Sequence, residues 1–417
     1  MKGRRVVVTG MGALTPIGNN LQDYWKALQN GVSGAAPITH FNPENFKTKF
    51  ACEVKSFEVT DFIHRKEARK MDLFCQYAMV ASDEAIIDSN LNLDEINLDR
   101  AGVIWGSGIG GMNSFQQETT NFAQGNGIPR YNPFFIPKLI SDIPAGHISI
   151  KHGFRGPNFT TVSACASSTN SLIDAFNYIK WNKADIFIAG GSEACVFETG
   201  IGGFNAMMAL STRNNDPKTA SRPFDKDRDG FVMGEGGGAI VIEEYEHALK
   251  RGAKIYAEIV GGGLTADAHH ITAPHPEGLG AHNVMQLAIE EAEIPVTDVD
   301  YINVHGTSTP LGDIAETKAI KALFGKHAYS LNISSTKSMT GHLLGAAGVI
   351  ESIACIMAVK DNVVPPTINH FTDDPDIDNK LNLTFNKAQK RTVNYALTNT
   401  FGFGGHNASL LFKKYTS

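Results

Sequence analysis

The sequence has little cysteine, and its few cysteines follow no pattern that builds a framework. There are five in 417 residues, an odd set without a C-x-x-C pair. A disulfide scaffold and a cysteine-rich zinc site both need paired or closely spaced cysteines, so neither is expected. The set fits a protein of a reducing cytoplasm and comprises Cys52, Cys75, Cys165, Cys195 and Cys355.

Excess positive charge and long apolar runs are also missing. The 37 Lys and Arg residues are outnumbered by 43 Asp and Glu residues, which gives a formal net charge of -6. Nucleic acid is therefore not an expected partner, because phosphate binding needs a basic surface. No apolar run approaches the roughly 18 residues that a membrane helix needs. Gly10, Gly12 and Pro16 interrupt the N-terminal apolar stretch too early for a signal peptide, so we expect a soluble, cytoplasmic protein.

Two common ligand motifs are absent as well. The turn at 10–12 follows an apolar strand but lacks the full G-x-G-x-x-G spacing of a dinucleotide fingerprint. The densest histidine cluster, at 267–275, does not match a zinc-helix spacing such as H-E-x-x-H. The sequence therefore predicts neither a nucleotide cofactor nor a metal.

One cysteine stands between a predicted strand and a predicted helix. Cys165 follows a short β-branched run and precedes apolar residues that recur at helical spacing up to Trp181. Small residues flank it on both sides. The unpaired N–H groups and the dipole of a helix N-terminus favour a thiolate over a thiol, so this pattern predicts a nucleophile. The alternative is a buried structural cysteine, since free cysteine is among the most buried residue types.

Two other turns carry histidines. The stretch 301–309 is an apolar strand that leads into His305 and a Gly/Thr turn. The stretch 335–342 places Lys337 and His342 just before a Gly/Ala-rich segment that is expected to be a helix from 341 to 359. A strand-end cysteine and two turn-borne histidines suggest a single site.

Together with 222–230 (RPFDKDRDG) and 399–405 (NTFGFGG), these stretches resemble the β-ketoacyl-acyl-carrier-protein synthases of thiolase fold. The resemblance is to their elongating type, synthase II, and it extends from 6–12 to the last apolar strand near Leu410. Several motifs in the same order are far more specific than any one of them.

The resemblance implies an α/β, thiolase-like fold in which two similar halves form a five-layered α-β-α-β-α arrangement. The stretch 257–263 echoes the opening strand and its glycine turn, which agrees with a duplication. We expect an N-terminal half, 1–250, that carries the nucleophilic cysteine. The C-terminal half, 251–417, is expected to carry both catalytic histidines.

The activity implied by the resemblance is an acyltransferase reaction. An acyl group on Cys165 would undergo decarboxylative Claisen condensation with malonyl-acyl-carrier protein, giving a β-ketoacyl-carrier protein two carbons longer, as in fatty acid elongation. His305 and His342 would stabilise the enolate as neutral donors, and Lys337 would lower their pKa values or organise the loop. Phe401 would act as a gate and, beside Cys165, as a backbone oxyanion donor. No cofactor is implied, because the substrates arrive on the phosphopantetheine arm of the carrier protein.

The remaining implied contacts concern substrate and partners. Thr307 and Thr309 would bind the pantetheine arm, although both residues also suit a turn that has no function. The other substrate contacts would be Ile109, Phe204, Phe134 and His270. Acyl carrier protein would dock on a basic patch, for which a solvated helix face is the alternative, formed by Lys66, Arg69 and Lys70. The resemblance also implies a homodimer.

Three other functions remain in competition. A ketosynthase of a dedicated polyene or polyketide pathway would share all of these motifs. A degradative thiolase shares the fold and the cysteine but commonly uses a second cysteine where this sequence has histidines. A non-catalytic chain-length partner subunit lacks the nucleophile, so Cys165 argues against it.

Overall fold

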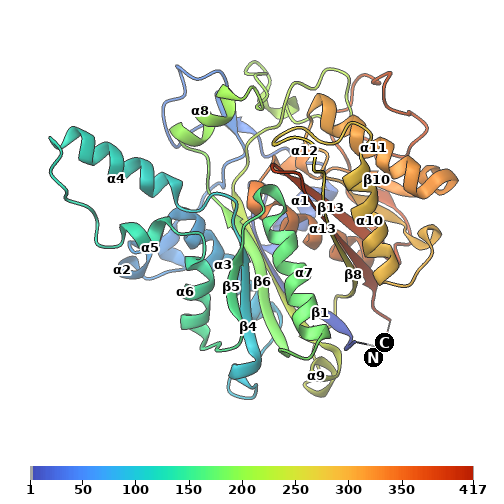
Figure 1. Ribbon diagram of the computed structural model, residues 1–417, viewed down its shortest axis with the longest axis horizontal. Helices are drawn as coiled ribbons and strands as arrows, with labels where there is room; N and C mark the ends of the chain where they lie inside the picture. Colours follow the sequence, from blue (N-terminus) through green and yellow to red (C-terminus); the bar gives the residue numbers. More distant parts are fainter. Residues whose placement is uncertain (1–2, 417) are drawn as a thin grey trace.

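The computed structural model describes residues 3–416, which form a layered α/β body with a projecting arm (Figure 1). A ten-stranded sheet runs in the order β10-β9-β13-β14-β8-β1-β7-β6-β4-β5. Two small hairpins lie outside it, β2 (Ala36–Pro37) with β3 (Phe50–Ala51) and β11 (Val363–Val364) with β12 (Gln389–Lys390). The predicted α/β layering is confirmed.

The sheet contains the same strand order twice. The first half comprises β1 (Val6–Leu14), β4 (Ala101–Gly106), β5 (Asn158–Thr161), β6 (Ile186–Glu193) and β7 (Gly236–Glu244). The second comprises β8 (Ala257–Ala266), β9 (Tyr301–Asn303), β10 (Asn332–Ser334), β13 (Tyr395–Gly402) and β14 (His406–Lys414). In the first half β4 pairs in parallel with β5 and β6, and β7 pairs antiparallel with β6 and β1. In the second half β9 likewise pairs in parallel with β10 and β13, and β14 pairs antiparallel with β13 and β8. Pairing of β1 with β8 joins the two halves.

Helices occupy three layers around these strands. The outer layer of the first half contains α3 (Leu73–Asp88) and α6 (Ile143–His152), and that of the second half contains α10 (Leu279–Glu291) and α11 (Pro310–Phe324). Between the halves lie α7 (Ser167–Lys180) and α13 (Ala347–Asp361), which contact strands of both. Every residue of α13 from 347 to 359 is buried, as expected of a helix that is covered on all sides.

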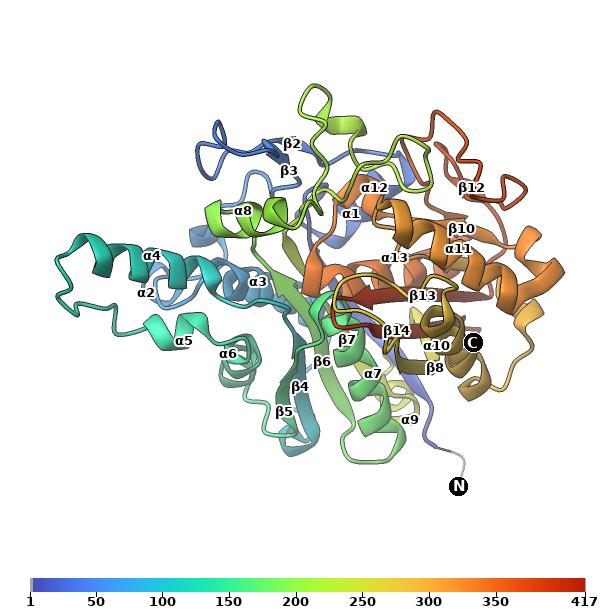
Figure 2. The ribbon, with the colours of Figure 1, turned by 45° about the horizontal axis from the view of Figure 1, so that its top comes forward.

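The remaining helices are shorter or peripheral. The arm, residues 112–139, contains α4 (Met112–Gln124) and α5 (Phe135–Leu139) and extends away from the body in both ribbon views (Figure 2). The others are α1 (Leu21–Gln29), α2 (Arg65–Ala68), α8 (Glu198–Ala206), α9 (Tyr245–Lys250) and α12 (Lys337–Thr340). Within the described chain, no helix has both the length and the apolar character needed to span a bilayer.

One predicted boundary was wrong. The helix expected from residue 341 begins only at Ala347. Gly341 and Leu344 have φ angles of +68° and +47°, which a right-handed helix does not allow. The intervening residues form a turn instead, and this turn contributes to the site.

Candidate active site

Cys165 lies at the predicted junction of strand, turn and helix. A short 3-10 turn, Ala164–Ala166, connects the end of β5 to α7. Its first residue, Ala164, directly precedes Cys165 and has a φ of +51°. A non-glycine residue in this region carries backbone strain, which is common where a reactive side chain is presented. The predicted strand-turn-helix around Cys165 is confirmed.

The Cys165 thiol faces His342. The distance from His342 Nε2 to Cys165 Sγ is 3.0 Å, and both residues are buried. Burial raises the pKa of Cys165 to about 12, which outweighs the lowering by the Lys337 ammonium and by the backbone N–H of Phe403. A helix terminus favours the thiolate, but at Cys165 desolvation of the charged form is the larger effect. His342 Nε2 lies within reach of the thiol proton.

His305 completes the constellation. It follows the end of β9, and its ring lies 5.2 Å from that of His342, nearly perpendicular to it. Burial lowers the pKa of both imidazoles well below the usual value, and Lys337 lowers them further. Both histidines are therefore neutral, as predicted, although burial rather than Lys337 is the main cause.

A buried glutamate, which the sequence reasoning missed, holds the His305 turn. Glu316 of α11 accepts hydrogen bonds from the backbone N–H groups of His305 and Gly306, each at 2.9 Å. Burial raises the pKa of Glu316 to about 7. Glu316 occupies the same helix face as the buried Ala319 and Ile320. Acidic residues at helical spacing among apolar ones, Asp313 and Glu316, are the signal that could have revealed it.

Lys337 lies behind the two histidines rather than in the cavity. Its ammonium is buried and donates a hydrogen bond to Glu351 Oε1. Burial raises the pKa of Glu351 to about 7, although Lys337 opposes this effect. Glu351 is thus an internal partner of Lys337 and not a helix-surface carboxylate.

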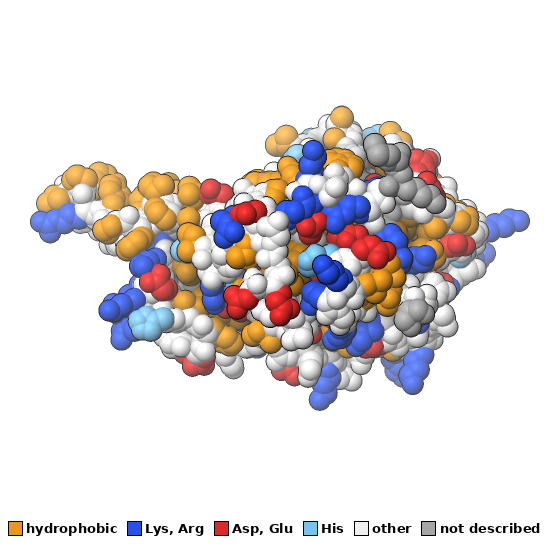
Figure 3. Space-filling model, turned by 90° about the horizontal axis from the view of Figure 1, so that it is seen from below, with side chains coloured by type: hydrophobic (Ala, Val, Ile, Leu, Met, Phe, Trp, Pro, Cys, Tyr) orange, Lys and Arg blue, Asp and Glu red, His pale blue; other side chains and the backbone are white. Residues whose placement is uncertain are grey.

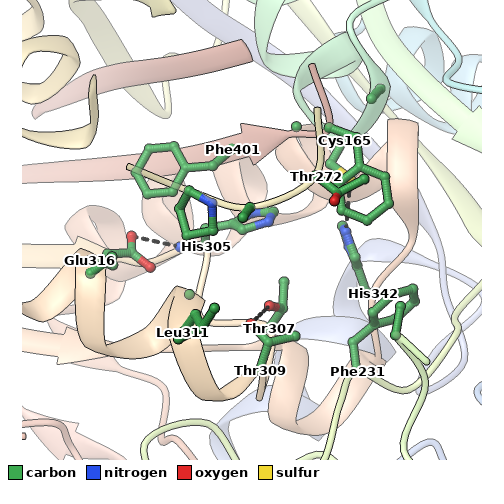
Figure 4. A pocket seen from close by; sticks show the side chains of 18 of the residues that line it. Cys165, Phe231, Thr272, His305, Thr307, Thr309, Leu311, Glu316, His342 and Phe401 are labelled. Atoms are coloured by element: carbon green, nitrogen blue, oxygen red, sulfur yellow. Dashed lines mark hydrogen bonds between the residues drawn. The ribbon is translucent and has the colours of Figure 1, made fainter. Parts of the chain in front are cut away.

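Cys165, His305 and His342 point into one cavity of about 580 Å³ (Figure 4). Thr307 and Thr309 line it, and their hydroxyl oxygens are 3.1 Å apart. The predicted residues that also line it are Ile109, Phe204 and Phe401. Further lining residues are Phe231, Asp267, Thr272, His275, Leu311 and Phe403.

The two phenylalanines at the end of β13 have different positions. The ring of Phe401 lies 5.6 Å from the His305 ring and lines the cavity, a position that suits a gate. The backbone N–H that approaches Cys165 Sγ belongs instead to Phe403, in the turn after the strand. The Phe403 N–H is therefore the backbone donor nearest to the thiol, beside the cavity that the Phe401 ring lines.

Two predicted substrate contacts lie outside this cavity in the described chain. Phe134 is on the arm, with the Lys70 ammonium 5.8 Å from its ring centroid. His270 is exposed, and its ring accepts hydrogen bonds from the N–H groups of Thr272 and Ala273. Its neighbours Thr272 and His275 line the cavity in its place, because the loop directs His270 outward.

The predicted docking residues lie on the surface at α2. Lys66 and Arg69 are exposed, and Lys70 pairs with Glu67 at 2.8 Å. Near the histidine cluster, and throughout the described residues, no group of three or more His, Cys, Asp or Glu side chains is arranged to hold a metal ion.

Comparisons with known proteins agree along the whole chain. Residues 3–248 match the family profile described as the beta-ketoacyl synthase N-terminal domain, and residues 256–371 match the corresponding C-terminal domain. A 3-oxoacyl-[acyl-carrier-protein] synthase 2 of Synechocystis sp. is 49% identical over 415 residues, covering 100% of this chain and 99% of its own. The protein of the same name in Staphylococcus aureus is 51% identical over 414 residues, covering 99% of each chain.

Solved structures show the same fold. A beta-ketoacyl synthase from Burkholderia phymatum matches with a TM-score of 0.92 and 35% identity, covering 99% of this chain and 100% of its own. A chain from a type II polyketide synthase acyl-carrier protein in complex with its hexaketide-bound ketosynthase matches with a TM-score of 0.91 and 32% identity, with the same coverage. The predicted thiolase-like ketosynthase fold is thereby confirmed.

Proposed function

Because the chain belongs to the β-ketoacyl synthase family, we propose that it elongates fatty acyl chains by decarboxylative condensation. An acyl group on Cys165 is joined to malonyl-acyl-carrier protein, and the product is a β-ketoacyl-carrier protein two carbons longer. The observation that carries this proposal is the meeting of one cysteine and two neutral histidines in one cavity, with His342 Nε2 3.0 Å from Cys165 Sγ.

The first step loads the acyl group. As Sγ attacks the acyl thioester, its proton passes to His342 Nε2 and then to the departing pantetheine thiolate, so that one thioester replaces another. Backbone N–H groups of Cys165 and Phe403 hold the negative charge on the tetrahedral oxygen. The acyl chain extends along the cavity wall that Ile109 and Phe204 form.

The second step forms the carbanion. When the carbon–carboxylate bond of the malonyl group breaks, its electron pair enters the thioester as an enolate and carbon dioxide leaves. The imidazole N–H group of His305, and that of His342 once its proton has moved from Nδ1 to Nε2, stabilise this charge without protonating the carbon, since both rings are neutral. The carbanion attacks the acyl carbon, the carbon–sulfur bond to Cys165 breaks, and the departing thiolate takes up a proton from water.

The entrance serves a substrate carried on a pantetheine arm. Thr307 and Thr309 offer hydroxyl groups to its amides along the route to Cys165. The surface cations Lys66, Arg69 and Lys70 favour an acidic carrier protein. An acyl carrier protein bound to a ketosynthase in one of the similar structures supports this partner.

We propose further that the protein is a homodimer. Strand β5 forms one end of the sheet, so its outer edge is open to a second copy. The arm exposes Phe115, Phe122, Ile128, Tyr131, Phe134 and Ile136, and hydrophobic side chains gather on it in the space-filling view (Figure 3). Such a dimer would bring Phe134 to the subunit interface, where it would help to close the pocket.

We also propose that the chain divides into halves, 1–250 and 251–417, and that the protein is located in the cytoplasm. The division is supported by the identical strand order on both sides of α9. The cytoplasm is supported by five free cysteines.

The test is to incubate the protein with malonyl-carrier protein and a ladder of acyl-carrier thioesters, and to measure intact masses. We expect an acyl adduct on Cys165 and β-ketoacyl products two carbons longer, with release of carbon dioxide. Acylation at another cysteine, or condensation without malonyl groups, would contradict the proposal and favour a thiolase. Preference for polyketide intermediates over fatty acyl groups would place the enzyme in a specialised pathway.

A further inference from the structure

A buried carboxylate that the mechanism above does not use lies beside the active site. Glu193 is the last residue of β6 and is fully buried. Burial of a carboxylate is costly unless its oxygens are well supplied with hydrogen bonds. Its surroundings therefore show what it does.

Glu193 accepts hydrogen bonds from two separate segments. Oε1 accepts from Ser107 Oγ at 3.1 Å, Ile109 N at 3.2 Å and Gly110 N at 3.3 Å. Oε2 accepts from Gly108 N at 2.8 Å and Gly345 N at 2.9 Å. Both oxygens are thus fully used, mostly by backbone groups that cannot turn away.

The two segments form different parts of the cavity. The loop 107–110 carries Ile109, the wall against which the acyl chain lies. Gly345 belongs to the turn that follows His342, and its neighbour Leu344 also lines the cavity. One carboxylate therefore connects the acyl wall to the segment that carries a catalytic histidine.

The segments touch so closely that one cannot move alone. A Cβ added at Gly345 would lie 2.3 Å from Gly108 N and 2.6 Å from Glu193 Oε2. A Cβ added at Gly108 would lie 2.9 Å from the same oxygen and 3.2 Å from the carbonyl oxygen of Ala164, next to Cys165. A backbone shift of the loop 107–110 toward Gly345 would therefore press on the carboxylate or on the turn after His342.

We propose that Glu193 is a positioning residue that sets acyl-chain-length selectivity by fixing the Ile109 wall to the His342 turn. This inference rests on the proposed condensing function and deepens it. A longer acyl chain must push this wall back against the hydrogen bonds to Glu193. The carboxylate therefore limits the chain that the pocket accepts while His342 remains in place.

A glutamine cannot take over this role. It is almost the same size, but its amide group presents one oxygen and two N–H donors. In one orientation the amide donors face Gly108 N and Gly345 N, which releases the turn after His342. In the other they face Ser107 Oγ, Ile109 N and Gly110 N, which leaves Gly108 N as the one contact to the loop 107–110. Either orientation weakens the connection between the two segments.

The experiment compares Glu193→Gln with a matched control, Glu84→Gln. Glu84 of α3 is also a carboxylate that accepts two backbone N–H bonds, from Ala13 at 2.9 Å and Leu21 at 2.8 Å, but it does not line the cavity. For each variant kcat/KM is measured across the acyl-carrier ladder, with melting temperature as the index of folding. Glu193→Gln should raise the ratio of long-chain to short-chain kcat/KM by about tenfold.

The preferred chain should lose up to about 100-fold in rate in Glu193→Gln, because small displacements of reacting groups have effects of this size. Glu84→Gln should keep the wild-type ratio even if it melts earlier. An unchanged ratio in folded Glu193→Gln would overturn the inference.

A second variant covers the case in which Glu193→Gln does not fold. Ser107→Ala removes one donor from Oε1 and leaves the carboxylate and the cavity lining in place. It should move the chain-length ratio in the same direction by a smaller factor, and a wild-type profile would count against the inference.

The outcomes for the inference and for the proposed function are distinguishable. If the wild-type protein forms no condensation product, the proposed function itself fails. If it elongates normally but neither variant changes the ratio, only the role of Glu193 fails.

Discussion

The two halves of the molecule contain the same turn with different chemistry. In the first half Ala164 has a φ of +51°, and in the second Leu344 has a φ of +47°. Each opens a 3-10 turn closed by a similar backbone bond, Ala166 N to Ser163 O at 3.1 Å and Ala346 N to Leu343 O at 3.0 Å. Each turn then leads into a central helix, α7 or α13.

The difference lies in the residue after the strained position. In the first half it is Cys165, whose thiol enters the cavity. In the second it is Gly345, whose N–H donates a hydrogen bond to Glu193. A side chain at this position would clash with the backbone of Gly108. The same backbone thus presents a nucleophile in one half and anchors a loop in the other, while the histidines come only from the second half. In the proposed reaction, the two copies of a duplicated fold would thus carry different tasks.

The largest effect should follow from removal of the nucleophile. Cys165→Ala should abolish acyl-enzyme formation and condensation, because Gly345 in the equivalent turn cannot substitute for it. Some release of carbon dioxide from malonyl-carrier protein should remain, since the histidines are intact. Labelled carbon dioxide release beside intact mass tests this, and retained condensation would show that the division of tasks is wrong.

The histidine variants should separate the two tasks next. His305→Ala and His342→Ala should each slow decarboxylation by about 100- to 1000-fold, because each removes one donor to the enolate. His342→Ala should also slow acylation, since its Nε2 lies 3.0 Å from the Cys165 sulfur and is the proposed acceptor of the thiol proton. Acylation of His305→Ala should continue. Decarboxylation at the wild-type rate in both variants would show that neither imidazole stabilises the enolate.

Gly345→Ala tests why the second turn holds no side chain. The added Cβ would lie 2.3 Å from Gly108 N, and overpacking of this kind typically costs about 1–3 kcal/mol. We expect a lower melting temperature and slower condensation, measured by calorimetry and by product formation. Gly203→Ala, on an exposed helical position with nothing within 4 Å of its added Cβ, is the control and should not destabilise. Equal behaviour of the two variants would mean that the second turn tolerates a side chain.

A moderate effect is expected at the acyl wall of the first half. Ile109→Phe should shorten the longest chain accepted, because the ring takes volume from an apolar cavity that cannot relax freely. Product lengths from the acyl ladder measure this. A profile identical to wild type would make Ile109 an ordinary core residue.

The smallest effect is on the pH dependence of stability. Burial holds the pKa of His305 well below its unfolded value near 6.5, so below this pH the unfolded chain binds a proton that the folded protein does not. The contribution of neutral His305 to the free energy of unfolding is present above pH 6.5. It is lost as pH falls, by at most about 1.4 kcal/mol per pH unit. His305→Gln should therefore lose less melting temperature than wild type between pH 7 and pH 5. An equal loss would mean that His305 is already charged in the folded protein.

Local patterns in the sequence determined much of this protein. The β-branched run, small residues and helical spacing around Cys165 predicted its turn, and the apolar strand before His305 predicted a strand end. These features depend on neighbours along the chain, which the sequence displays directly. The order of the motifs identified the family, and with it the layered fold.

The tertiary structure alone decided what the buried charged and reactive groups do. Glu193 and Glu316 look like ordinary acidic residues in the sequence, and only folding brings the N–H groups of distant loops to their oxygens. The state of Cys165 was also decided this way. Its helix terminus is local and favours the thiolate, but its burial is made by strands and turns of both halves, and desolvation prevails.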